Sequence, residues 1–147
     1  MHVLDGAANY SRFLSHAGTP VPHAPVAEWA FATGDHDRDG VLDLYAIKRA
    51  GTSGQTEVHV LDGSTGFTQW STHAVTPVPA SDESWDWTVD DYDGDGWDEV
   101  YGIKRDGASG STEVHVLADR TYASFAFSGR LPLPATDGVP GWRFLAD

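Results

Sequence analysis

Apolar and polar residues alternate along short segments of the chain, and no stretch has the longer period of an amphipathic helix. The segment Glu57-Val58-His59-Val60 shows the period of two that is typical of a half-buried strand. Such segments are rich in β-branched and aromatic residues, and clusters of Gly, Asp, Ser and Pro between them indicate turns. The pattern therefore predicts an all-β protein made of short strands.

This pattern recurs with a period of 56 residues. The segment 45–61 returns as 101–117, and 13 of its 17 positions are identical. Residues 2–6, His-Val-Leu-Asp-Gly, also match residues 59–63 at a spacing of 57. A fixed period of this kind indicates a stacked or circular repeat fold. The 147 residues hold 147/56, or roughly 2.6 units.

Each full unit contains four short extended segments, which we expect in the second unit at 85–91, 99–105, 113–117 and 124–130. A four-stranded antiparallel unit of this length has the size of a β-propeller blade, whose faces need neighbouring blades for burial. The repeats predict one propeller segment over residues 1–147. Within it, residues 1–28 form the outer part of a first blade, 29–84 repeat 1, 85–141 repeat 2 and 142–147 the start of a third repeat.

Propellers close with about four to eight blades, so fewer than three units cannot form a ring alone. We therefore expect a fragment of a longer chain, and as the alternative a homo-oligomer.

An acidic loop with fixed spacing lies between the first and second segments of each full unit. The loops read Asp35-His-Asp-Arg-Asp-Gly-Val-Leu-Asp43 and Asp91-Tyr-Asp-Gly-Asp-Gly-Trp-Asp-Glu99. Alternate carboxylates along a tight loop converge on one point, and Gly40 or Gly96 supplies the positive-φ turn. Hard oxygen ligands of this kind suit Ca²⁺, whereas Mg²⁺ resists shedding its waters.

We expect two Ca²⁺ sites, with side-chain oxygens from loop positions one, three, five and nine and a backbone carbonyl from position seven. The expected ligands are Asp35, Asp37, Asp39, Val41 and Asp43 in the first loop, and Asp91, Asp93, Asp95, Trp97 and Glu99 in the second. Ala46 and Gly102 stand where an EF-hand needs a bidentate Glu, so these are β-flanked loops. The alternative is that Asp and Gly merely favour surface turns. Clustered carboxylates repel one another unless a cation neutralises them, which favours the metal.

The charge balance and hydropathy of the chain limit the classes of molecule that the protein is expected to bind. The chain has 22 acidic and 9 basic side chains and a formal charge of −13, which argues against nucleic acid because binding phosphates needs a basic face. No apolar stretch approaches the roughly 18–20 residues that cross a bilayer, so we expect no membrane insertion, and the N-terminus does not read as a signal peptide. There is no cysteine for a thiolate metal site or nucleophile.

The period, the four-segment unit and the Asp-x-Asp-x-Asp-Gly-x-x-Asp loop together resemble the FG-GAP/VCBS-type repeats of calcium-containing β-propellers, the class that includes integrin-α heads. The segment 56–67 is similar to tandem repeats found beside secreted actinobacterial enzymes and lectin-like proteins. The resemblance implies that 29–35, 85–91 and 142–147 are innermost strands, that both acidic loops bind Ca²⁺, and that the protein is secreted. Glu99 departs from the family's Asp. Asp147 begins a third loop.

Aromatic residues in or near turns are candidates for stacking on a sugar ring, because a flat apolar ring with a polar handle suits that ligand. These candidates are Tyr10, Trp70, Tyr92, Trp97 and Tyr122. Lys48 and Lys104 recur at equivalent positions, where a solvated strand face is the alternative to a polar site read once per blade. Trp85 and Trp87 are expected to project to one face and to pack in the core.

Histidines recur on strands at positions 59 and 115, and their spacing builds no zinc site. The chain also lacks a Gly-x-Ser-x-Gly elbow, a His-Glu-x-x-His motif and a phosphate-binding glycine loop, so we do not expect an enzyme. We expect a non-catalytic, calcium-binding module that binds carbohydrate through repeated lectin-like sites. The alternatives are a protein-interaction or adhesion propeller with a cell-surface partner, and a structural accessory domain of a secreted hydrolase.

Overall fold

The computed structural model describes residues 1–118, 120–136, 138 and 144, and this part of the chain is all-β apart from two short 3₁₀ turns, η1 (Gly6–Ala8) and η2 (Val26–Glu28). The strands are β1 (His2–Leu4), β2 (Phe13–His16), β3 (Trp29–Gly34), β4 (Asp43–Lys48), β5 (Gln55–Leu61), β6 (Trp70–Pro79), β7 (Trp85–Asp90), β8 (Glu99–Lys104), β9 (Ser111–Ala118) and β10 (Ser124–Pro134). Within the described residues, no helix has the length and apolarity to cross a membrane.

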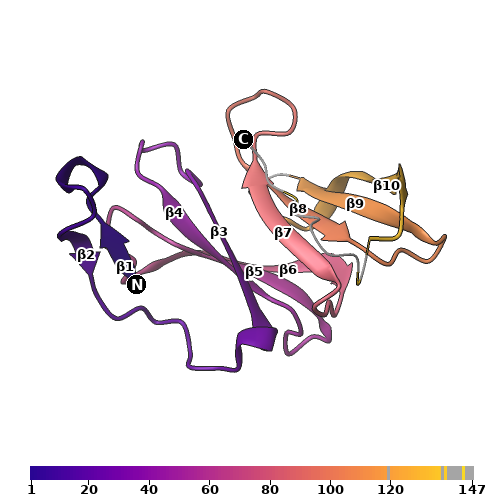
Figure 1. Ribbon diagram of the computed structural model, residues 1–147, viewed down its shortest axis with the longest axis horizontal. Helices are drawn as coiled ribbons and strands as arrows, with labels where there is room; N and C mark the ends of the chain where they lie inside the picture. Colours follow the sequence, from indigo (N-terminus) through magenta and orange to yellow (C-terminus); the bar gives the residue numbers. More distant parts are fainter. Residues whose placement is uncertain (119, 137, 139–143, 145–147) are drawn as a thin grey trace.

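The described strands form three antiparallel sheets, each made of strands consecutive in the chain (Figure 1). β1 pairs with β2, β3 to β6 form a four-stranded sheet that we call sheet I, and β7 to β10 form sheet II. The four strands expected in the second unit are confirmed as β7 to β10, with β10 extending to Pro134. The pairing of Trp29 with Lys48 recurs as Trp85 with Lys104, so the two sheets share one register.

Sheet I is covered on both faces, which explains its sequence. Along β4, Tyr45 and Ile47 alternate with Leu44 and Ala46, so the two pairs point to opposite faces. All four residues are buried. A strand buried on both faces is apolar along its whole length. For this reason residues 44–47 lack the polar alternation that a solvated sheet would show.

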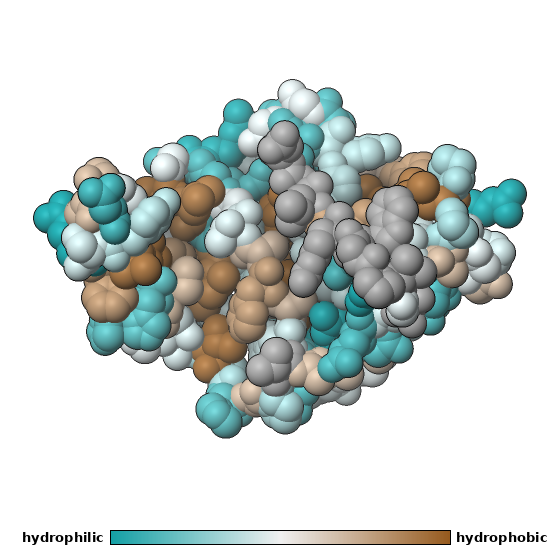
Figure 2. All heavy atoms as spheres, viewed as in Figure 1, coloured by the Kyte–Doolittle hydropathy of each residue, from teal (hydrophilic) through white to brown (hydrophobic). Residues whose placement is uncertain are grey.

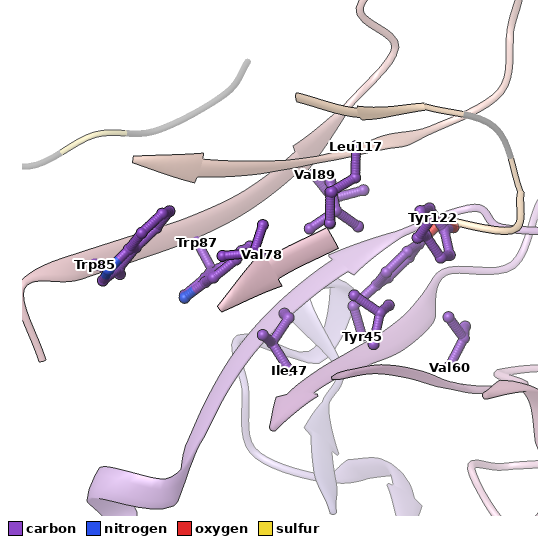
Figure 3. Close-up of a cluster of buried hydrophobic side chains, with 11 residues drawn as sticks. Tyr45, Ile47, Val60, Val78, Trp85, Trp87, Val89, Leu117 and Tyr122 are labelled. Carbon is purple, nitrogen blue, oxygen red and sulfur yellow. The ribbon is translucent and has the colours of Figure 1, made fainter. Parts of the chain in front are cut away.

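The main core lies between sheets I and II, where β3 lies beside β7 (Figure 1). The close-up in Figure 3 shows side chains from both sheets meeting in this layer. Its buried members are Tyr45, Ile47, Val58, Val60, Val78, Trp85, Trp87, Val89, Val100, Leu117 and Tyr122. The stacked rings of Trp85 and Trp87, with centroids 5.5 Å apart, confirm that both tryptophans are core residues.

A smaller core attaches the β1–β2 pair to the opposite face of sheet I. Its buried residues are Leu44, Leu61 and Phe67, and Met1, Val3, Val21 and Trp70 pack against them. The three sheets therefore stack in the order in which the chain forms them. Within the described residues this stack is open, and no closed ring forms. The strand expected at 142–147 and the loop expected to begin at Asp147 lie outside the described residues, apart from Phe144.

The interface between sheets I and II makes equivalent positions unequal. Trp87 is 8% exposed, whereas Phe31, one repeat earlier, is 54% exposed. We predict that Trp87→Ala lowers the free energy of unfolding by about 3–5 kcal/mol, because it leaves a cavity between the sheets. Phe31→Ala is the matched control and should change it by about 0.5 kcal/mol or less. Urea denaturation followed by circular dichroism measures both, and equal losses would contradict the assignment of this core.

Candidate functional site

The two acidic loops occupy equivalent corners of the two large sheets, one between β3 and β4 and the other between β7 and β8. Gly40 and Gly96 have φ values of 83° and 87°, which confirms the positive-φ turn expected there. The fourth loop position is also left-handed, with φ of 65° at Arg38 and 78° at Gly94. The loops therefore share one backbone conformation although their residues differ at this position.

The first Asp of each loop organises the backbone. The two carboxylate oxygens of Asp35 accept hydrogen bonds from the amides of Asp39 at 3.1 Å and Gly40 at 3.0 Å. Asp91 accepts the equivalent bonds in the second loop, at 3.2 and 2.8 Å. Carboxylates that accept bonds from nearby amides in this way give the backbone of a tight turn the hydrogen bonds that a helix or sheet would otherwise supply.

Each loop brings three carboxylates together, and each offers an oxygen within 4.8 Å of the other two. The groups are Asp35, Asp37 and Asp39 in the first loop, and Asp91, Asp93 and Glu99 in the second. Negative charges at this separation repel one another, and a cation between them turns the repulsion into attraction. Both groups therefore have the donor set to hold a metal ion.

The ninth loop position differs between the loops. Asp43 is buried outside the first group, and its two carboxylate oxygens accept hydrogen bonds from the amides of His36 at 2.9 Å and Gly63 at 2.7 Å. Glu99 is one methylene longer and belongs to the second group, while also accepting a bond from the Tyr92 amide at 2.8 Å. The expected ligand Asp43 thus holds its loop through hydrogen bonds to two backbone amides, whereas Glu99 lies among the converging carboxylates.

The carboxylates at loop position five accept hydrogen bonds from the backbone of their own loops. Asp95 lies outside the second group and accepts a hydrogen bond from the Trp97 amide at 2.8 Å. Asp39 accepts the equivalent bond from Val41 at 2.7 Å. Ligation by the backbone carbonyls of Val41 and Trp97 stays a prediction.

Burial raises the pKa of both carboxyl groups at position nine. For Glu99 the hydrogen bond from the Tyr92 amide opposes this rise, and the charges of Asp93 and Asp95 add to it. For Asp43 the amides of Gly63 and His36 oppose the rise. Ionising these groups costs free energy in the absence of a neighbouring cation.

The two loops are also joined to each other across the sheets. Asp98, at position eight of the second loop, accepts a hydrogen bond from the Asp35 amide at 2.6 Å. A Cβ atom on Gly34 would overlap the Asp98 carboxylate, so this approach requires glycine. The guanidinium of Arg38 lies 4.8 Å from the centroid of the Trp97 ring. Asp98 was not among the residues expected from the sequence. The one sign of its role in the sequence is that position eight is a carboxylate in the second loop and a leucine in the first.

A buried hydrogen-bond network around His36 connects the first loop to the core. His36 Nδ1 lies 2.9 Å from the hydroxyl of Tyr122, and His36 Nε2 lies 2.8 Å from Thr72 Oγ1. Burial lowers the pKa of His36, and the charge of Arg120 adds to this shift. Tyr122 is 0% exposed. The expectation that Tyr122 stacks on a ligand is therefore wrong, because its ring belongs to the core beneath the first loop.

The other expected contact residues are scattered. Tyr10 is exposed in the β1–β2 connection, and Trp70 packs partly buried against the smaller core. Lys48 and Lys104 are half-buried at the ends of β4 and β8, and Lys104 Nζ lies 6.0 Å from the Trp85 ring centroid. Only Tyr92 and Trp97 of these candidates lie on an acidic loop.

A cavity of about 520 Å³ opens beside the second loop. Its polar and aromatic lining includes Asp93, Asp95, Trp97, Glu99, Arg120 and Thr121. The guanidinium of Arg120, from the β9–β10 connection, lies 4.3 Å from the Trp97 ring centroid. The cavity thus combines an aromatic ring, a positive charge, a hydroxyl group and carboxylates of the second acidic loop.

Comparison of the chain with known protein families, with curated protein sequences and with solved structures gives no match. Function must therefore be inferred from the residues and geometry described above.

The link between the loops can be measured. We predict that Asp98→Ala lowers the free energy of unfolding by about 1–3 kcal/mol in the presence of chelator, because the partly buried Asp35 amide loses its acceptor. Leu42→Ala, at the equivalent position of the first loop, is the matched control. Leu42 is 59% exposed, and its removal should cost about 0.5 kcal/mol or less. A larger loss for Leu42→Ala in urea denaturation would contradict the link.

Proposed function

We propose that the protein is a non-catalytic, calcium-binding module built from β-propeller-type blades. The observation that carries this proposal is the presence of three converging carboxylates at the same corner of two sheets with the same register. A loop that only reverses the chain has no need for this repeated charge. Ca²⁺ accepts irregular arrays of carboxylate and carbonyl oxygens, whereas Mg²⁺ demands a near-ideal octahedron.

In this proposal sheets I and II are neighbouring blades, and their shared core is the blade interface. The β1–β2 pair is then the outer part of a preceding blade, and the chain is a segment of a larger or oligomeric propeller. Two bound ions would change the formal charge from −13 to −13 + 4 = −9. An extracellular location agrees with the proposal, because calcium sites of modest affinity fill there.

We further propose that the ligand is a carbohydrate bound in the cavity beside the second loop. The Trp97 ring supplies an apolar surface for a sugar, and Arg120 and Thr121 supply hydrogen-bond donors. The first loop has Val41 where the second has Trp97. The aromatic part of this site is therefore not repeated, although the calcium loops are.

A protein partner is the second candidate, and exposed apolar side chains favour it. Brown, hydrophobic atoms gather on the left of the face in Figure 2. Large exposed apolar residues of the N-terminal third include Leu4, Phe13, Leu14, Phe31, Val41 and Leu42. Exposed patches of this kind are typical of adhesion and protein-interaction surfaces. A purely structural accessory domain would bind neither class of ligand.

Calcium binding has a defined stoichiometry to test. We predict two Ca²⁺ ions per chain by isothermal titration calorimetry and a higher melting temperature in calcium than in chelator, because the ions bind only the folded loops. Asp37→Ala and Asp93→Ala should each leave one ion. Asp106→Ala removes an exposed charge outside the loops and should leave two. Identical melting curves in calcium and in chelator would refute the calcium sites.

Carbohydrate binding is tested separately on a glycan array, with calcium and with chelator. We predict calcium-dependent binding to a defined sugar that Trp97→Ala abolishes while two Ca²⁺ ions remain bound. Tyr10→Ala is the control, because Tyr10 is exposed far from the loops in sequence. A blank array from folded, calcium-loaded protein would contradict the carbohydrate proposal and leave the calcium proposal standing.

A further inference from the structure

Histidines face each other across neighbouring strands at two places in the molecule. His59 on β5 is paired in register with His73 on β6, and their Nδ1 atoms are 2.7 Å apart. His2 on β1 is paired in the same way with His16 on β2, with Nδ1 atoms 3.0 Å apart. The strand register, not the spacing in sequence, brings these nitrogens together.

The separation suits two ligands of one metal ion. An imidazole nitrogen lies about 2.0–2.1 Å from a bound divalent ion, so two nitrogens at a right angle are about 2.9 Å apart. The observed distances of 2.7 and 3.0 Å, at which one Nδ1–H group donates to the other Nδ1 atom, bracket this value, so an ion would take the place of the shared proton. Right angles between ligands are typical of Cu²⁺ and Ni²⁺, and imidazole suits both ions.

A carboxylate orients His59 for this role. Glu57 Oε2 lies 3.3 Å from His59 Nε2, slightly beyond an ordinary hydrogen bond, and Nε2 is buried with no closer polar partner among the described residues. A proton on Nε2 therefore faces the carboxylate and leaves the lone pair on Nδ1, toward His73. Metal-binding histidines commonly donate their other N–H group to a carboxylate in this manner.

The surroundings fix one ring and leave the other accessible. The rings of Trp29 and Trp70 lie 5.7 Å from the ring of His59, centroid to centroid. His73 is exposed, and a cavity of about 250 Å³ opens beside Glu57, His59 and His73. An ion can reach the two Nδ1 atoms from this side, and water can complete its coordination.

We propose that His59 and His73 form a binding site for a divalent late transition metal ion, Cu²⁺ or Ni²⁺, with Glu57 as a positioning residue. The site goes beyond the calcium-dependent function proposed above and does not depend on it. The imidazole nitrogens, which suit late transition metals, separate it from the acidic loops, which offer only hard oxygens.

Sheet II carries a natural control for this site. His115 on β9 corresponds to His59, and Glu113 to Glu57, but the residue opposite His115 on β10 is Ser128. His115 Nδ1 lies 2.9 Å from Ser128 Oγ. His73→Ser therefore converts the proposed site into an arrangement that the protein already contains and folds with. Ser128→His makes the reverse change.

The experiment is a Cu²⁺ titration by calorimetry, with electron paramagnetic resonance of the loaded protein. His2→Ser is the background, which breaks the second histidine pair, and excess Ca²⁺ occupies the acidic loops. We expect one tight Cu²⁺ ion with two nitrogen ligands. His73→Ser should weaken it by more than about tenfold and remove the two-nitrogen signature, while Glu57→Gln should weaken it by about tenfold and keep that signature.

Adding Ser128→His to the His2→Ser protein should create one further Cu²⁺ site with the same two-nitrogen spectrum. Circular dichroism checks that each variant is folded. Cu²⁺ binding that is unchanged by His73→Ser, or a spectrum without two nitrogen ligands, would overturn the proposal. So would a failure of Ser128→His to add an ion in a folded protein.

Discussion

The structure depends on the need to cover both faces of sheet I. Tyr45 and Ile47 on one face of sheet I are buried by sheet II, and Leu44 on the other face packs in the core shared with the β1–β2 pair. A sheet with apolar residues on both faces cannot be stable in water by itself. The stacking of the sheets therefore buries both faces of sheet I, and the loops at the sheet corners take their positions from this stacking.

Local signals in the sequence predicted the elements well. The period of 56 and the turn residues located β7 to β10, and the glycines at loop position six correctly indicated positive φ at Gly40 and Gly96. Tyr122 shows the limit of such signals. A tyrosine near a turn looks the same whether it faces solvent or, as here, bonds His36 in the core. Its place depends on how two sheets pack, which one strand's pattern does not encode.

The residues that act across sheets or strands were the hardest to foresee. Asp98 bonds the Asp35 amide 63 positions earlier in the chain, and His59 meets His73 through register alone. Near-identity between repeats also conceals differences in role. Glu99 joins its carboxylate group, whereas Asp43, at the same loop position, is fully engaged by two amides. The two side chains differ by one methylene group, and only the longer one, Glu99, lies among the clustered carboxylates.

The bond between Asp98 and the Asp35 amide gives the two repeats a fixed order. Asp98 of the second repeat accepts this bond from the first repeat. Leu42, the equivalent residue of the first repeat, has no carboxylate and cannot accept such a bond. Exchanging the two repeats would leave the first loop facing a leucine, and it would also exchange residues that differ, such as Trp87 of the core and Phe31. The Asp98 side chain thus adds to the features that make the repeats non-interchangeable, and it gives the stack a direction that their sequence similarity hides.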